Sequence, residues 1–200
     1  MAVKARRALV LLVLIWSPLV TMLPARVHAS IAPGTWSTLP PMPTTRGGFA
    51  LAAGNDGRMY AIGGGDTAFH VFKTVEAYSP ATNTWSAVAS LTTPRAGLAA
   101  VSGPDGRIYA IGGGNYSQPN AQSAVFLDSV EAYDVATNTW TPVASMPTRR
   151  GGTVAVVAKA PDGSPAIYVL GGDRRLSSPG NNFQMYSPKT DTWSLPPEMP

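Results

Sequence analysis

The stretch Tyr60-Ala61-Ile62-Gly63-Gly64 decides the fold, because it returns twice further along the chain. The copies read Tyr109-Ala110-Ile111-Gly112-Gly113 and Tyr168-Val169-Leu170-Gly171-Gly172. Tryptophans recur in the same phase, at a spacing of about 50 residues that is typical of one kind of repeat protein: Trp36, Trp85, Trp140 and Trp193. The chain is therefore predicted to be built from one structural unit used several times.

Each repeat has the pattern of four short strands joined by tight turns. In the first repeat we expect strands at residues 48–53, 59–62, 75–78 and 85–88. Asp56-Gly57 is typical of a tight hairpin turn, and Asn83 tolerates the left-handed backbone that the last turn needs. The strands are apolar on both alternating faces, which indicates sheets that are covered on both sides.

Three landmarks resemble the kelch family: the double glycine, the tyrosine seven residues before Trp85, Trp140 and Trp193, and the tryptophan itself. The resemblance runs from about Trp36 to Trp193. It implies an all-β, kelch-type β-propeller with three complete four-stranded blades at about 46–91, 95–146 and 150–199. Kelch propellers include partner-binding scaffolds, a copper oxidase and a sugar epimerase, so the resemblance implies no single activity.

The phase of the repeat predicts an incomplete propeller. Residues 35–39 have the pattern of a fourth strand without the three strands that should precede it, and residues 196–200 resemble the lead-in at 40–43. In the kelch family such an orphan N-terminal strand completes the last blade. We therefore expect a truncated product or fragment, whose ring is completed by missing downstream blades or by another chain.

Residues 1–29 have the pattern of a secretory signal peptide. Three basic residues lie among the first seven, an apolar run follows at 8–20, and Val27-His28-Ala29 precedes Ser30. We expect cleavage after Ala29 and a secreted, periplasmic or extracellular protein without stable membrane insertion. The alternative is a membrane-anchoring helix, but the run is short for a span and prolines interrupt it.

Charge and cysteine content exclude several function classes. The chain has 15 basic and 11 acidic residues, and four of the basic ones lie in residues 1–29, which leaves 11 of each. A nucleic-acid footprint needs clustered excess Lys and Arg, so no nucleic-acid partner is expected. The chain has no cysteine, so neither disulfides nor a lipoprotein anchor can form.

Catalytic and metal-binding residues are scarce. After removal of residues 1–29, His70 is the only histidine, whereas zinc sites use several His or Cys ligands. The copper oxidases of the kelch class use a Tyr–Cys crosslink that this chain cannot form. No catalytic residue, metal site or cofactor is predicted.

The long loops predict the binding face instead. Strands alternate in direction, so the loops at 66–74, 115–129 and 173–182 should share one face, and variable polar loops on a rigid scaffold commonly carry binding residues. An arginine lies ten residues after Trp36, Trp85 and Trp140, and we expect these three arginines to lie on this face and contact an acidic ligand. The alternative is that they support the blade junctions by hydrogen bonds. The predicted ligand-binding residues are Arg46, Arg95, Arg150, His70, Tyr116, Arg174 and Arg175.

Two functions fit these observations. The first is an exported, non-catalytic binding or scaffold module that engages a protein or glycan through the long-loop face. The second is a fragment of a kelch-class carbohydrate-active enzyme, a sugar epimerase or oxidase-like protein, with its catalytic residues in missing blades. The lack of paired carboxylates and of a histidine cluster favours the first.

Overall fold

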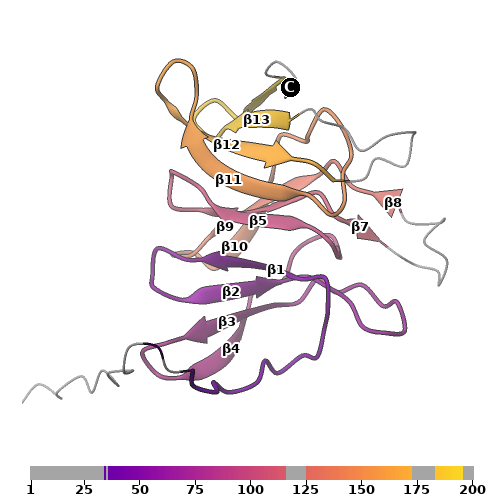
Figure 1. The fold of residues 1–200 in the computed structure, drawn as a ribbon, viewed down its shortest axis with the longest axis vertical. Helices are drawn as coiled ribbons and strands as arrows, with labels where there is room; N and C mark the ends of the chain where they lie inside the picture. The colour runs from indigo at the N-terminus through magenta and orange to yellow at the C-terminus, as the bar shows by residue number, and fades with distance from the viewer. Residues whose placement is uncertain (1–33, 35, 116–124, 173–182, 196–200) are drawn as a thin grey trace, which may run out of the picture. The chain divides into compact units, whose positions relative to one another are not determined.

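The computed structural model describes residues 34, 36–115, 125–172 and 183–195, and it contains three four-stranded antiparallel sheets (Figure 1). We call each sheet a blade. Blade 1 contains β1 (Ala50–Ala53), β2 (Met59–Ile62), β3 (Val75–Ser79) and β4 (Thr84–Val88). Blade 2 contains β5 (Ala99–Ser102), β6 (Ile108–Ile111), β9 (Val130–Asp134) and β10 (Thr139–Val143). Blade 3 contains β11 (Val154–Lys159), β12 (Pro165–Leu170), β13 (Phe183–Ser187) and β14 (Thr192–Ser194).

The all-β prediction is confirmed: the described residues contain no helix. None of them could therefore cross a membrane as a helical span. A short pair of strands, β7 (Gly114–Asn115) and β8 (Val125–Phe126), extends the long loop of blade 2. The predicted signal peptide, residues 1–29, lies outside the described residues, and the chain from Ser37 onward forms one compact unit.

The predicted strands of blade 1 are found, with small shifts at their ends. β2 has the expected bounds, whereas β1 begins two residues late because Gly48 has a φ of 61° and cannot continue an extended strand. The turn residues behave as expected from their type. Gly57 has a φ of 79° and Asn83 one of 56°, and the equivalent residues of blades 2 and 3 also have positive φ.

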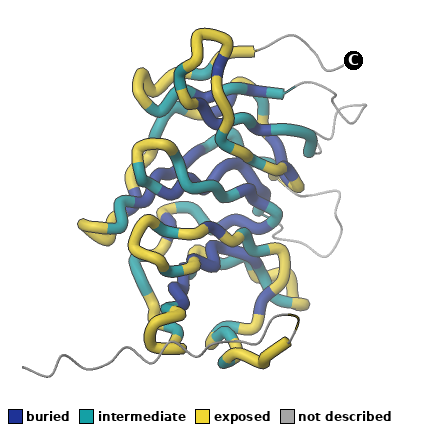
Figure 2. Tube along the Cα trace, turned by 60° about the vertical axis from the view of Figure 1, so that its left-hand side comes forward, coloured by how far each residue is buried: buried dark blue, intermediate teal, exposed yellow. Residues whose placement is uncertain are grey.

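The core lies between the blades (Figure 2). The first strand of blade 2, β5, lies between β1 and β11, so the three blades share an inner edge. One cluster joins Tyr60 and Ile62 of blade 1 to Ile108 and Tyr133 of blade 2, and a second joins blade 2 to blade 3 in the same way. Burial against neighbouring blades explains why the strands are apolar on both faces.

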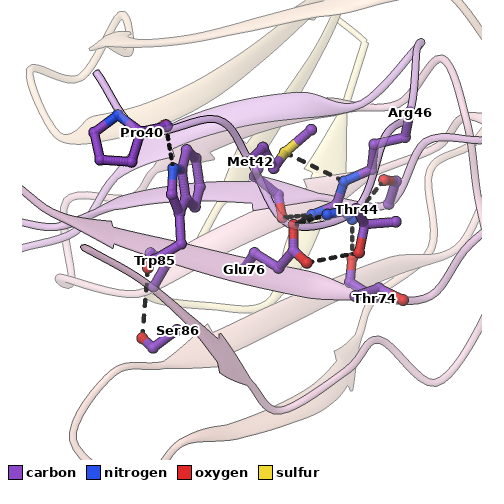
Figure 3. A network of polar contacts seen from close by, with 11 residues as sticks. Pro40, Met42, Thr44, Arg46, Thr74, Glu76, Trp85 and Ser86 are labelled. Atoms are coloured by element: carbon purple, nitrogen blue, oxygen red, sulfur yellow. Dashed lines mark hydrogen bonds and ion pairs between the residues drawn. The ribbon is translucent and has the colours of Figure 1, made fainter. Parts of the chain in front are cut away.

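A tryptophan marks each joint between successive repeats. Trp140 Nε1 donates to Ala89 O at 2.8 Å, and Trp193 Nε1 donates to the equivalent carbonyl one repeat later. Trp85 Nε1 donates in the same way to Pro40 O at 3.0 Å (Figure 3). Each accepting carbonyl lies four residues after the tryptophan of the preceding repeat, so Pro40 occupies the position of an inter-blade connector.

The predicted orphan strand does not pair with any strand. Its described residues, 36–39, are assigned to no strand, and Trp36 is fully exposed. This agrees with the expectation that the segment has no sheet of its own to join. Residue 35 and residues 196–200, which resemble the lead-in, lie outside the described residues.

Candidate functional site

Arg46 connects the segment before β1 to the two middle strands of blade 1 (Figure 3). Its Nη1 donates to Gly63 O at 3.0 Å and Thr74 O at 2.7 Å. Its Nη2 donates to Glu76 Oε2 at 2.7 Å, and the Thr44 hydroxyl donates to the other oxygen of the same carboxylate at 2.6 Å. The guanidinium is fully covered, so it holds strand ends together from inside the blade.

Arg95 makes the same contacts in blade 2, in a fully buried position. Its Nη1 donates to Gly112 O at 3.0 Å and Ser129 O at 2.8 Å, and its Nη2 donates to Glu131 Oε1 at 2.7 Å. Burial lowers the pKa of Arg95, while the charge and hydrogen bond of Glu131 oppose the shift. The guanidinium stays protonated at neutral pH, so this is a buried ion pair.

Arg150 occupies the equivalent position in blade 3 and is also fully buried. Its Nη1 donates to Gly171 O at 2.7 Å. The position of the two glutamates is taken here by Gln184, which faces Val169 as Glu76 faces Ala61. The buried arginine is therefore repeated in all three blades, and in the third a neutral side chain stands where the other two have a glutamate.

Arg46 and Arg95 thus support the fold by hydrogen bonds, but within one blade and not across a blade junction as the alternative hypothesis had it. Each ties the segment before the first strand to the second and third strands of its own blade. Contact between the three arginines and a ligand stays a prediction. Tyr116, Arg174 and Arg175 lie outside the described residues, so the structure does not place them.

His70 lies at a pocket of about 400 Å³ on the long-loop face of blade 1. The loop between β2 and β3 forms one wall, through residues 65–67 and 69–71. Thr45, Arg46 and Gly47 form another, and Ala96 is contributed by the next blade. Gly47 and Gly65 exchange backbone hydrogen bonds of 2.8 and 2.9 Å, which hold the first two walls together.

Asp66 organises the loop that borders this pocket. Its carboxylate accepts hydrogen bonds from the backbone N–H groups of Ala68 and His70, both at 2.9 Å, and lies 2.8 Å from His70 Nδ1. These hydrogen bonds, the one to the His70 ring first, lower the pKa of Asp66. The carboxylate is therefore ionised at neutral pH and fixes the backbone of the loop.

Phe69 is held in an unusual conformation by this loop. Its φ is 66°, in the left-handed region that a bulky residue rarely adopts, and 47% of its surface is exposed. Left-handed backbone at such residues costs about 1–3 kcal/mol and is concentrated at functional sites. His70 and Arg46 of this pocket are among the predicted binding residues, whereas Phe69 is not, although an aromatic residue in a long loop is a visible signal.

The described residues offer little for catalysis. They contain no cluster of three or more His, Asp or Glu side chains that could hold a metal ion. Burial first, then hydrogen bonds to Asp56 and Asp105, raises the pKa of Tyr60 and Tyr109, so both phenols are protonated and unsuited to act as bases.

Repeat pattern, blade topology and buried arginine motif together agree with the family comparison. The model described as Kelch motif matches residues 46–92, 95–147 and 165–200. The chain belongs to the kelch family. A search of curated proteins finds no match.

Solved structures show the same kelch fold. The one titled "Structure of YjhT" aligns with a TM-score of 0.64 and 21% sequence identity. The alignment covers 82% of this chain and 55% of that one, so the chain spans about half the length of this structural relative. At this level of identity the likeness concerns the fold alone.

Proposed function

We propose that the chain is an exported, non-catalytic kelch module that binds a segment of a partner protein at the pocket beside residues 65–71. Kelch propellers commonly act as protein-interaction scaffolds, and the long-loop face carries this pocket. Export rests on the signal-peptide pattern of residues 1–29.

The observation that carries the proposal is the exposed Phe69 in a left-handed backbone that Asp66 holds in place. A free loop would relax this strain, so the loop is built to keep an aromatic ring at the edge of the pocket. Rigid aromatic side chains are favoured in protein interfaces because they bury a large area at low cost in conformational entropy. His70 and Asp66 add polar groups that orient the bound segment.

A peptide-display selection on the secreted protein, followed by titration calorimetry with the selected peptide, tests the proposal. Phe69→Ala should weaken binding at least tenfold, because truncating an interface aromatic anchor costs about 2 kcal/mol or more. Lys189→Ala, an exposed change in the β13–β14 turn of the opposite face, is the matched control and should leave the affinity unchanged.

A glycan array probed with the same two variants distinguishes a protein partner from a sugar ligand. Glycan binding that is lost in Phe69→Ala, together with no peptide selected, would replace the protein partner by a sugar. Peptide binding that is equal in Phe69→Ala and in the native chain would refute the assignment of this pocket.

A further inference from the structure

The pocket beside residues 65–71 presents a carboxylate to a ligand. Three residues that line it have ionisable side chains: Arg46, Asp66 and His70. The Arg46 side chain is fully covered and bound to Glu76, so it offers no charge to a ligand. The Asp66 side chain is 33% exposed, and its hydrogen bonds lower its pKa, so it is ionised at neutral pH. With His70 neutral, the pocket carries a net negative charge.

The Asp66 carboxylate has room for one more hydrogen-bond donor. An ionised carboxylate offers about four acceptor positions, two on each oxygen. Oδ1 accepts the backbone N–H groups of Ala68 and His70, both at 2.9 Å, and Oδ2 lies 2.8 Å from His70 Nδ1. No described residue occupies the second position on Oδ2, which is therefore open to a ligand.

His70 adds a second acceptor next to this carboxylate. Because an ionised carboxylate can only accept, Nδ1 carries the proton in the contact with Asp66. Nε2 of the neutral ring is then an acceptor. The His70 side chain is 74% exposed, so a ligand can reach the ring. The loop thus offers two acceptors, which suits a ligand group that donates.

Phe69 supplies an aromatic surface to the same pocket. Its backbone N–H donates to Asp66 O at 3.2 Å, so the ring and the carboxylate extend from one tight turn. The face of an aromatic ring attracts cations through its electrostatic field. The carboxylate, the imidazole and the ring therefore favour the same kind of ligand group, one that is positively charged and donates hydrogen bonds.

We propose that the segment bound at this pocket is anchored by a basic side chain, arginine in preference to lysine, which donates to Asp66 and lies against Phe69. This anchor rests on the proposed function and specifies its partner. A guanidinium has five donors in one plane and stacks on aromatic rings, so it can use both acceptors and the ring, whereas an ammonium is a point charge. An acidic side chain would meet the Asp66 carboxylate without a cation to offset the repulsion.

Two random peptide libraries, displayed against the secreted protein, test the kind of anchor. One contains all residue types and the other lacks Arg and Lys. The full library should give binders that share a basic residue and lose about tenfold or more in affinity with Phe69→Ala. The second library should give no binder that depends on Phe69.

The possible failures of the two libraries are distinguishable. Equally tight, Phe69-dependent binders from the library without Arg and Lys would overturn the basic anchor and leave the pocket assignment standing. Binders from the full library that bind Phe69→Ala as well as the native chain would refute the pocket assignment, and the anchor with it. The absence of any binder from either library would do the same.

A double-mutant cycle tests the contact between the basic side chain and Asp66. Replacing the arginine of a selected peptide by citrulline, which has the same shape and no charge, should weaken binding to the native chain about tenfold or more. In Asp66→Asn the same replacement should cost only the share of the aromatic ring, about threefold. Distortion of the loop would weaken both peptides equally and leave this difference unchanged. An equal loss from citrulline in the native chain and in Asp66→Asn would overturn the contact.

Asp162→Asn is the matched control for this cycle. Asp162 is exposed in the β11–β12 turn of the opposite face, and its carboxylate also holds a turn, through the Ser164 N–H at 2.9 Å. The variant removes the same charge from the chain as Asp66→Asn does. The full loss from citrulline should therefore persist in Asp162→Asn. A loss that shrinks there as much as in Asp66→Asn would assign the effect to long-range charge and overturn the contact at the pocket.

Discussion

Replacing Glu131 by Gln should destabilise the protein by about 3 kcal/mol, at the lower end of the range for removing one partner of a buried ion pair. Glu131 is 2% exposed, and its carboxylate accepts hydrogen bonds from Arg95 Nη2 at 2.7 Å and Thr92 N at 2.7 Å. Glutamine has the same shape, and Gln184 shows that blade 3 accommodates it at the equivalent position. The substitution therefore removes the charge and one acceptor without leaving a cavity.

The size of the effect follows from what remains around Arg95. Its Nη1 keeps the carbonyls of Gly112 and Ser129, which is why we expect the low end of the range. Glu131→Ala should cost more, because each buried N–H left without an acceptor adds about 1–3 kcal/mol. Replacing both partners by apolar residues should restore much of the loss, since a buried pair often gains little over hydrophobic packing.

Urea unfolding followed by tryptophan fluorescence measures the free energy of unfolding of each variant. Arg149→Ala is the control, because the Arg149–Asp128 pair is mostly exposed and such changes usually alter stability by less than about 0.5 kcal/mol. Equal unfolding curves for Glu131→Gln and Arg149→Ala would refute the reasoning. If Arg95→Ala keeps full stability and loses binding of an acidic ligand, the arginine acts at a ligand and not in the blade.

Four further predictions concern single features. Gly63→Ala should destabilise the protein by about 1–3 kcal/mol in urea unfolding, because a side chain there meets a positive φ of 64° and a carbonyl of the next blade. Trp140→Phe should cost about 1 kcal/mol in the same assay, since it removes one hydrogen bond and little apolar area. Because the pKa of Asp66 is lowered in the folded state, its support for the loop is present above its ordinary pKa of 3.8 and is lost as the pH falls through the lower folded value. The protection factor of the His70 amide against hydrogen exchange should fall over that range, and Asp66→Asn should abolish the change. N-terminal sequencing of exported protein should begin at Ser30, and recovery of an intact N-terminus in the membrane fraction would contradict the signal peptide.

The repeat was enough to predict the fold because its information is local. Asp-Gly and Asn turns, double glycines and apolar four-residue strands each act within one hairpin, where residue type dictates backbone conformation. The observed β2 has the predicted bounds, and Asn83 has the predicted left-handed backbone. The late start of β1 was missed because Gly48 was counted as strand, although the structure gives it a positive φ.

The sequence by itself determined the kelch fold, the positions of the strands, and the presence of an arginine at the same phase of every repeat. Only the tertiary structure decided what surrounds each arginine, because Glu131 lies 36 residues from Arg95 and meets it only when the blade is assembled. The pocket at Phe69 likewise needs Ala96 of the next blade. Contacts between distant residues depend on how sheets pack, and packing is governed by burial over a whole face that no single stretch of sequence contains.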